Sequence, residues 1–398
     1  MAGPEQARQQ QAMLPLERAQ ALVLAAARPV PGPLPLDQAG GLVLAETVIS
    51  PQPSPLFDNS AMDGFAIAAT TGAPQRTVIA EIPAGKTWDG ELGPDQALRI
   101  MTGAQVPASA EAVVPIEEIS VAGNQIEILA AVKPGQHIRR QGEEFRPGDP
   151  LLEAGMLLNP AAIGLLASIG QADVQVYLAP RVAVLATGSE LLPIGAPLLP
   201  GMLRDSNSPT LAACVREAGA LPVLYGILPD EPEAIRAALE RAFAENDIVL
   251  TSGGVSVGDY DYVQQILLEM GLERIFWKVA IKPGKPVLFG TLAGKLLFGI
   301  PGNPASALTV FEVLVRPALR RLLGHKDLYR PQLTGILSTA VKAAPDRLQL
   351  LRMIHRDGHF EPLKGQGSSN LLTVARANAL LPVYRDYAAG ESVTAWQT

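Results

Sequence analysis

The sequence predicts a multidomain protein in which an α/β domain with a mainly parallel sheet is combined with a helical N-terminal domain and two small β domains. Three observations support this prediction. At 398 residues the chain is long for a single domain. Strand-like and helix-like segments alternate between Arg181 and Leu322, as in repeated βα units. On either side of that region, short strand-like segments are separated by turn residues, which is typical of small β domains.

The composition excludes several classes of protein. Hydrophobic residues make up 48% of the chain and charged residues 18%, which suits a folded protein with ample core, and the net charge of −7 provides no basic field for nucleic acid or an anionic membrane. No apolar run approaches the roughly 20 residues of a membrane span. The N-terminal MAGPEQARQQQ lacks the apolar core of a signal peptide. We therefore expect a cytoplasmic protein with neither nucleic-acid nor membrane partners.

Cysteine and histidine are too scarce for a disulfide framework or a cysteine-rich zinc site. The single cysteine, Cys214, lies in a helical pattern with Leu211, Val215 and Ala218, so we expect it to be a buried core residue. The four histidines have no ligand-like spacing.

Residues 1–48 are helical in pattern and precede a run of short strands. Apolar residues at helical spacing form one stripe: Leu16, Leu22, Val23 and Ala26. From 51 to 141, turn signals such as Lys133-Pro134-Gly135 separate strand-like pieces. Asn159-Pro160 then predicts a short helix ending at Gly170. We expect this helix to rejoin the N-terminal helices, which makes the β segment an insertion.

Strands and helices alternate through the expected α/β domain. Expected strands cover 182–186, 222–228, 247–251, 274–281, 286–289 and 296–300. Expected helices cover 208–219, 230–244, a segment ending at 270, and 303–322. Such a sheet binds ligands at the carboxyl ends of its strands. Residues 327–398 return to short strands and turns, a second small β domain.

The stretch Thr251–Tyr262, TSGGVSVGDYDY, connects an expected strand to an expected helix. Glycines let backbone N–H groups converge on an anion, and a helix N-terminus adds positive potential. Three glycines, three hydroxyls and an aspartate exceed what a turn requires, and the aspartate suits a metal beside the anion. We expect ligand binding by Ser252, Gly253, Gly254, Ser256, Gly258 and Asp261.

Polar clusters also lie at other strand ends and helix starts. Thr187-Gly188-Ser189-Glu190 ends the first strand of the α/β domain. Asp205-Ser206-Asn207-Ser208 opens the next helix, where both N-capping and ligand binding stay open. Asp230 begins a capping box, and this structural role is enough to account for an aspartate at the position. A functional role is the alternative.

Lysines and a second turn extend the expected site. Lys278 and Lys282 are four apart in an expected strand and so point to one face, which suggests an anion between them or a solvated edge. Lys285 follows. Pro301-Gly302-Asn303-Pro304 then forms a strand–turn–helix entry at the same predicted sheet edge.

The first β domain contains two further polar clusters. Asx turns could absorb Asp58 and Asn59, but Asp63 is left over. The segment 138–144 combines Arg139 and Arg140 with two glutamates. It is either an exposed charge cluster or the rim of a phosphate-and-metal site.

Seven motifs together resemble a known family. In order, they are DNSAMDG, MTGA, IRRQGEE, TGSEL, SGGVSVGDYDY, WKVAIKPGKP and IPGNPASA. They closely resemble the molybdopterin molybdenumtransferases, the gephyrin-like enzymes of molybdenum cofactor synthesis, over nearly the whole chain. The resemblance implies a discontinuous helical domain (1–48 with 142–178), an inserted β domain (49–141), an α/β domain of molybdopterin-binding type (179–326) and a C-terminal β-barrel (327–398). It also implies a homodimer with each active site at the subunit boundary.

The resemblance further implies a Mg²⁺-assisted transferase that takes adenylylated molybdopterin and molybdate, releases AMP and leaves molybdenum on the dithiolene. Its implied catalytic residues are Asp63, Glu190, Asp261, Lys278 and Lys282. The implied metal ligands are Glu144, Glu190, Asp230 and Asp261, and Glu144 stands where the family more often has aspartate. The expected substrate-binding residues are Thr102, Arg139, Arg140, Thr187, Gly188, Asp205, Ser206, Asn207, Ser252, Gly253, Gly254, Ser256, Gly258, Lys285, Pro301, Gly302, Asn303, Pro304, Arg352 and Ser368, of which the last two match looser patterns.

The expected chemistry agrees with these residue types. Lysine, hydroxyl and backbone N–H donors suit the molybdate oxyanion, and Mg²⁺ on carboxylates would neutralise charge at phosphorus. Two alternatives are a molybdopterin adenylyltransferase, which the α/β domain alone resembles, and a non-enzymatic gephyrin-type scaffold. The β domains and DNSAMDG argue against the first, and the lack of a long linker or fused enzyme domain in this sequence argues against the second. Further expected partners are the adenylyltransferase and acceptor molybdoenzymes.

Overall fold

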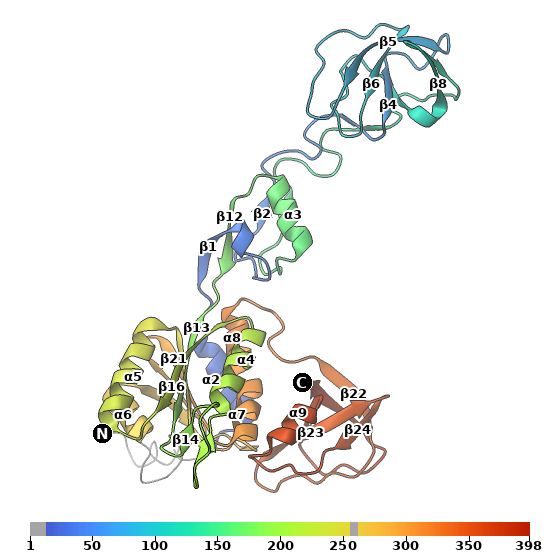
Figure 1. The fold of residues 1–398 in the computed structure, drawn as a ribbon. Helices are drawn as coiled ribbons and strands as arrows, with labels where there is room; N and C mark the ends of the chain where they lie inside the picture. The colour runs from blue at the N-terminus through green and yellow to red at the C-terminus, as the bar shows by residue number, and fades with distance from the viewer. Residues whose placement is uncertain (1–12, 255–261) are drawn as a thin grey trace. The chain divides into compact units, whose positions relative to one another are not determined.

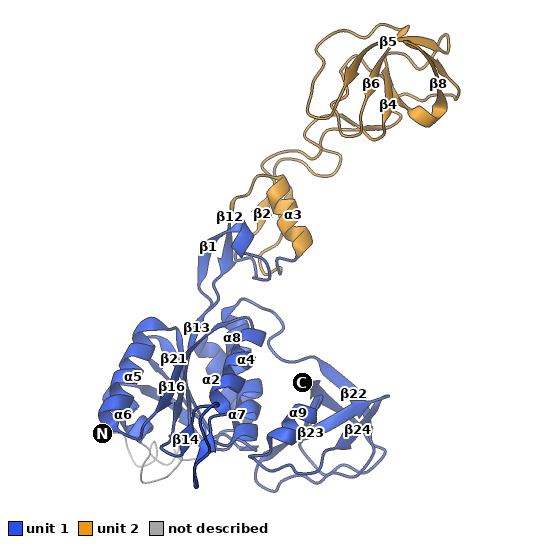
Figure 2. Cartoon of the chain, viewed as in Figure 1, with its two compact units in different colours: residues 1–45, 157–159, 173–398 blue, residues 46–156, 160–172 orange. Residues whose placement is uncertain are grey.

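The computed structural model describes residues 13–254 and 262–398, which form two compact units. Of the described residues, unit 1 contains 13–45, 157–159, 173–254 and 262–398, and unit 2 contains 46–156 and 160–172 (Figure 2). Each unit has its own sheets and cores.

The centre of unit 1 is a six-stranded sheet in the order β16-β13-β17-β21-β20-β18. Its strands are β13 (Arg181–Thr187), β16 (Leu221–Leu228), β17 (Ile248–Ser252), β18 (Glu273–Trp277), β20 (Leu288–Leu292) and β21 (Lys295–Ile300). The first four strands in sheet order are parallel, and β20 and β18 add antiparallel pairs at one edge. The prediction of a mainly parallel sheet is confirmed.

Helices cover both faces of this sheet (Figure 1). One face packs on α5 (Pro232–Glu245) and α6 (Tyr262–Glu269), and the other on α4 (Asn207–Glu217) and the continuous helical run α7 (Pro304–Val310), η3 (Phe311–Val315) and α8 (Arg316–Leu322). Successive residues of a strand point to opposite faces, so Val182 and Val184 join one core while Ala183 and Leu185 join the other. Within the described ranges, no helix combines the length and apolar character needed to cross a membrane.

Helix α2 (Leu16–Ala26) packs on the α/β domain, and this differs from the expected helical domain. Its apolar stripe places Leu16, Ala19 and Val23 in the same core as α8 and η3. The helix predicted from Asn159-Pro160 does form, as α3 (Pro160–Ser168), but it belongs to unit 2. An amphipathic stripe predicts that a helix packs, but it does not identify the surface on which it packs.

The expected strand over 274–281 is also different in the structure. β18 ends at Trp277, and Lys278 takes a φ of 86°. The chain resumes an extended course as β19 (Ile281–Lys282), which pairs with a strand of the C-terminal domain and not with the central sheet. The prediction that Lys278 and Lys282 share one face of a single strand is therefore wrong.

The C-terminal part of unit 1 is a closed five-stranded barrel, as the predicted β-barrel requires. Its strands are β22 (Gln332–Leu337), β23 (Leu348–Arg356), β24 (His359–Pro362), β25 (Ala379–Val383) and β26 (Ser392–Gln397). The order β23-β24-β22-β26-β25 closes because β25 pairs back onto β23, and β19 pairs in parallel with the first two residues of β23. A short helix, α9 (Leu371–Arg376), lies between β24 and β25.

Unit 2 is built on a six-stranded sheet in the order β7-β4-β6-β5-β9-β8, in line with the predicted β segment. Its strands are β4 (Gly64–Ile67), β5 (Gln75–Ile82), β6 (Gln96–Ile100), β7 (Ala112–Pro115), β8 (Ile119–Ala122) and β9 (Gln125–Ile128), with η2 (Ile116–Glu118) before β8. Two-stranded pairs join β3 (Asn59–Ser60) to β10 (Ile138–Arg139) and β2 (Val48–Ile49) to β11 (Pro150–Leu152). In unit 1, β1 (Pro31–Pro35), followed by η1 (Leu36–Gln38), pairs with β12 (Asp173–Tyr177).

Candidate functional site

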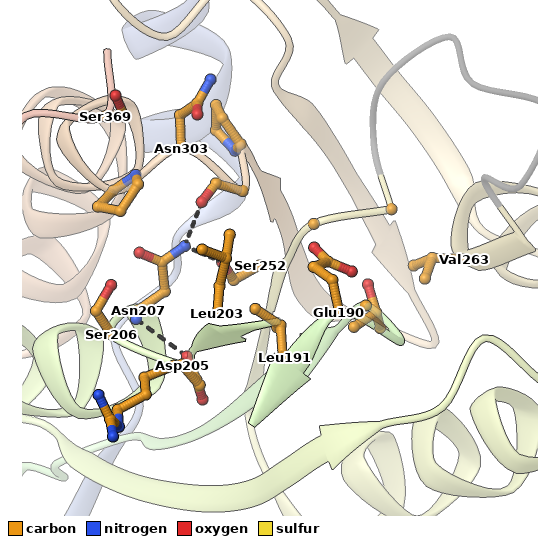
Figure 3. Close-up of a pocket in the computed structure, with 18 of the residues that line it drawn as sticks. Glu190, Leu191, Leu203, Asp205, Ser206, Asn207, Ser252, Val263, Asn303 and Ser369 are labelled. Atoms are coloured by element: carbon orange, nitrogen blue, oxygen red, sulfur yellow. Dashed lines mark hydrogen bonds between the residues drawn. The ribbon is translucent and has the colours of Figure 1, made fainter. Parts of the chain in front are cut away.

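A cavity of about 820 Å³ lies in unit 1 at the carboxyl ends of β13, β17 and β21 (Figure 3). This is the sheet edge at which parallel α/β sheets bind ligands. Four segments at strand ends or before α4 supply most of its lining: 187–191 without Ser189, 203–207, 252–254 and 301–304. The other lining residues are Asp230, Ile235, Val263, Pro286, Ser369 and Leu371.

Close approach of two loops explains why glycine occupies position 253. Gly253 has a φ of 93°, and its N–H donates to the carbonyl of Ile300 over 3.1 Å. A Cβ at this position would lie 2.8 Å from the carbonyl oxygen of Thr187. Glycine therefore allows the ends of β13 and β17 to meet at the base of the cavity.

The side chain of Asn207 connects three of the lining segments. Its amide Nδ2 donates to Ser252 Oγ over 2.7 Å and to the carbonyl of Gly302 over 2.8 Å. Figure 3 labels Asn207 and Ser252 and marks hydrogen bonds of Asn207 with dashed lines. Asn207 is 9% exposed and Ser252 3%. The start of α4 is thereby joined to the ends of β17 and β21.

Asp205 caps helix α4. Its Oδ1 accepts hydrogen bonds from the backbone N–H groups of Asn207 and Ser208, both over 3.0 Å. Ser206 occupies the N-cap position itself, but its side chain makes no capping hydrogen bond. Capping, one of the two roles left open for this cluster, is thus carried by Asp205, and Ser206 remains at the cavity wall.

Asp230 does not cap helix α5, although its sequence position predicts a capping box. The N-cap is Glu231, with no side-chain capping bond. The Asp230 carboxylate instead accepts from both the N–H and the hydroxyl of Ser189, over 2.9 and 2.8 Å. Ser189, 41 positions away in sequence, donates to this carboxylate in place of the local backbone N–H groups of a capping box.

The described lining of the cavity carries more negative than positive charge. Glu190, Asp205 and Asp230 contribute carboxylates, and Arg204, at the end of β15 (Leu203–Arg204), is the sole cationic side chain among the lining residues that the structure describes. β15 pairs in parallel with β14 (Leu191–Leu192). Over the described residues, no group of three or more His, Cys, Asp or Glu side chains could hold a metal ion together.

The three predicted lysines are not among the residues that line this cavity. Lys282 and Lys285 are exposed, and the Lys278 ammonium lies 3.9 Å from the centre of the Trp277 ring. Their neighbour Pro286 does reach the cavity. Because β18 ends at Trp277 and the backbone changes direction at Lys278, the three lysines do not lie along one straight strand as expected.

The C-terminal domain reaches the cavity through Ser369, one residue beyond the predicted Ser368, and through Leu371. The Ser368 carbonyl accepts from the N–H of Ser306 in α7. Arg352 is 2% exposed, and its Nη2 donates to the carbonyl of Gly367 over 3.1 Å. This hydrogen bond holds the backbone directly before Ser368. Burial lowers the pKa of Arg352.

The predicted site residues of the first β domain lie in unit 2. Asp63 Oδ1 accepts from the N–H and hydroxyl of Thr102 over 2.7 and 2.8 Å, and these hydrogen bonds lower the Asp63 pKa. Glu144 Oε2 accepts from the hydroxyl of Ser54 over 2.6 Å. All three predicted residues, Asp63, Thr102 and Glu144, are exposed.

The basic segment beside them is partly paired. Arg140 forms a 2.6 Å ion pair with Asp58, and the N–H of Gln141 donates to the same carboxylate. The backbone hydrogen bond from Gln141, followed by the contact with Arg140, lowers the Asp58 pKa. Asp58 is therefore held by the arginine segment and not by an Asx turn, while Arg139 is exposed at the end of β10.

Three predicted site residues, Ser256, Gly258 and Asp261, lie outside the described residues. Among the residues that sequence reasoning missed, Arg204 and Ser369 line the cavity. Arg204 directly precedes the predicted cluster that begins at Asp205, so its position in the sequence could have marked Arg204 as a site residue. Ser369 lies beside the recognised Ser368.

Three sequence families match consecutive parts of the chain. The family described as MoeA N-terminal region (domain I and II) matches residues 14–170, and the probable molybdopterin binding domain matches residues 183–321. The MoeA C-terminal region (domain IV) matches residues 334–398. The cavity described above lies largely within the second of these matches.

Relatives and a solved structure match most of the chain. A Mycobacterium tuberculosis protein named molybdopterin molybdenumtransferase 2 is 40% identical over 86% of this chain and 88% of its own length. A Haemophilus influenzae molybdopterin molybdenumtransferase is 37% identical over 85% of this chain and 86% of its own length. The crystal structure of a molybdopterin biosynthesis MoeA protein from Pyrococcus horikoshii superposes with a TM-score of 0.82 and 30% identity, covering 97% of this chain and 99% of that one. This chain therefore belongs to the molybdopterin molybdenumtransferase family.

Proposed function

We propose that this protein is a transferase that inserts molybdenum from molybdate into adenylylated molybdopterin, releases AMP and so forms the molybdenum cofactor. The observation that carries the proposal is the 820 Å³ cavity at the carboxyl edge of the sheet, inside the segment matched as a probable molybdopterin binding domain. Relatives that align with most of the chain carry the name molybdopterin molybdenumtransferase.

The cavity offers donors suited to an oxyanion. Its lining includes Ser206, Ser252 and Ser369, which carry hydroxyl groups, and Asn303, which carries a side-chain amide. Hydrogen bonds from such donors to an anionic oxygen are stronger than those between neutral groups. We assign Thr187, Gly188, Gly253, Gly254 and the turn 301–304 to shaping this binding surface, together with Ser256 and Gly258.

Magnesium is part of the proposal because of the charge balance in the lining. Among the described lining residues, three carboxylates and one guanidinium leave an excess of negative charge, which disfavours a phosphate or molybdate without a cation. Mg²⁺ is commonly held by one or two carboxylates together with substrate oxygens and water, so a three-ligand protein cluster is not required. Glu190 and Asp230, with Asp261, would hold the ion. When bound, it would neutralise charge that develops on the adenylyl phosphate.

We further propose that the protein acts as a cytoplasmic homodimer whose active site combines the cavity of one subunit with residues from the β domain of the other. Those residues are Asp63, Thr102, Arg139, Arg140 and Glu144. Lys278, Lys282, Lys285, Arg352 and Ser368 are proposed to complete the binding of the anionic substrate. An adenylylating enzyme would supply the substrate, and apo-molybdoenzymes would accept the product.

A single assay tests the reaction. The purified protein, given adenylylated molybdopterin, Mg²⁺ and molybdate, should release AMP, and omission of molybdate should reduce the release. Consumption of ATP in the presence of unmodified molybdopterin would instead indicate the adenylyltransferase. Failure to act on either substrate would favour a scaffold.

A further inference from the structure

We propose that Asn207 does not bind the substrate but orients the hydroxyl of Ser252, so that Ser252 donates its proton to an anionic oxygen in the cavity. This changes the expected role of Asn207 from substrate ligand to positioning residue. The inference rests on the proposed function, because it assigns one donor for the oxyanion in that reaction.

The orientation of the Asn207 amide follows from its two partners. The carbonyl of Gly302 can only accept a hydrogen bond, so the group 2.8 Å from it must be the Nδ2 of Asn207. The same Nδ2 lies 2.7 Å from Ser252 Oγ. Its two hydrogens are thus divided between Gly302 and Ser252, and Ser252 must accept.

A serine hydroxyl that accepts from Asn207 still has its own proton to donate. Ser252 is 3% exposed at the end of β17 and belongs to the cavity lining. Among residues 13–254 and 262–398, Asn207 is its sole side-chain hydrogen-bond partner, and no acceptor takes the hydroxyl proton. The proton is therefore available on the cavity side.

Such a donor is already oriented before the ligand arrives. Asn207 is itself 9% exposed, and its attachment to Gly302 limits rotation of the amide. The proton that remains on this hydroxyl favours a ligand oxygen that accepts a hydrogen bond, as an anionic oxygen does. The ligand chemistry is a tetrahedral oxyanion, which is shared by the adenylyl phosphate and molybdate.

Steady-state AMP release tests this inference with each substrate varied in turn. Ser252→Ala should raise one KM about ten- to a hundredfold, the range for a hydrogen bond to a charged group, with kcat changed less than about threefold. A change in the KM for molybdate identifies molybdate as the ligand. A change in the KM for adenylylated molybdopterin identifies the phosphate.

Asn207→Ala should raise the same KM, and the double variant should raise it less than the product of the two single effects. Thr251→Val is the matched control. Thr251 is the preceding residue of β17, is 1% exposed, has a hydroxyl without a hydrogen-bond partner in the described part of the chain, and does not line the cavity. Both KM values should stay within about twofold in this variant. Melting temperatures would identify any variant that fails to fold.

Unchanged KM values in Ser252→Ala would overturn the inference while the wild-type reaction still stands. Fully multiplicative effects of Ser252→Ala and Asn207→Ala would also overturn it, because Asn207 would then act independently of Ser252. Absence of molybdate-dependent AMP release in the wild type would overturn the proposed function, and this inference with it.

Discussion

The carboxylate of Asp230 accepts two hydrogen bonds from one residue, Ser189, through its N–H at 2.9 Å and its hydroxyl at 2.8 Å. This contact joins the loop after β16 to the loop after β13. Ser189 directly precedes Glu190, so Asp230 also fixes the segment that brings a second carboxylate to the cavity. Asp230 can therefore act by holding a loop, by holding a metal ion, or both.

Asp230→Asn should separate these two roles. The amide oxygen of asparagine can still accept from Ser189, but the negative charge is lost. We expect the variant to keep its melting temperature and to need about ten times more Mg²⁺ for half-maximal AMP release, in line with a lost carboxylate ligand. Asp230→Ala, which loses both roles, should also lower kcat. An unchanged magnesium dependence in Asp230→Asn would leave Asp230 with the loop role alone.

Gly253→Ala should destabilise the α/β domain more than a glycine replacement in open space. The left-handed φ of 93° and the 2.8 Å approach to the Thr187 carbonyl both oppose a Cβ. Together they should cost about 2–5 kcal/mol. Gly294→Ala is the control, because it has a φ of 80° in the β20–β21 turn but no atom within 4 Å of the added Cβ, and it should cost about 1–2 kcal/mol. Equal losses in thermal unfolding would show that the approach of Thr187 is not limiting.

Cys214 should be unreactive in the folded protein. Burial raises the pKa of its thiol from 9.0 to about 12, with a further contribution from Glu312. Iodoacetamide at pH 8 should leave it unmodified until urea is added, as judged by mass spectrometry. Rapid modification of the native protein would contradict its assignment to the core.

The same shift predicts a pH dependence of stability. Because folding raises the pKa, the folded protein keeps a proton that the unfolded chain releases. The resulting stabilisation is fully present below about pH 9 and is lost as the pH rises toward about 12. The Cys214→Ser variant should lack this component. The difference in unfolding free energy between the wild type and the variant should therefore change as the pH rises from about 9 toward about 12, while AMP release by the variant stays near the wild-type rate. Parallel curves for the two proteins would contradict the shift.

Sequence pattern predicted the central sheet and the edge that carries the cavity. Apolar strands alternate with amphipathic helices. Ser252 ends β17, and Gly253 and Pro301 follow β17 and β21, whose carboxyl ends meet at one edge. The break at Lys278 could not be predicted, because the apolar pattern continues through Trp277, Val279 and Ile281 although the backbone changes direction there.

Tertiary contacts account for the other differences. A capping box is a local motif, whereas Asp230 is held by Ser189 from another loop. Ser369 lines the cavity because the C-terminal domain packs beside α7, where Ser306 donates to the Ser368 carbonyl. Neither contact leaves a periodic signal in the sequence.

Mixing two inactive variants should restore activity if the active site uses both subunits. Asp63→Ala changes the exposed carboxylate that accepts from Thr102 in unit 2, and Glu190→Ala changes the cavity of unit 1. We expect each variant alone to be inactive. In heterodimers, one of the two sites carries neither lesion, so random subunit exchange should recover up to about a quarter of wild-type AMP release.

The two lesions on one chain should recover none when that protein is incubated alone. Exchange should be verified with differently tagged subunits. If exchanged heterodimers stay inactive, Asp63 does not contribute to the partner's site, and the proposal of an active site shared between subunits is wrong.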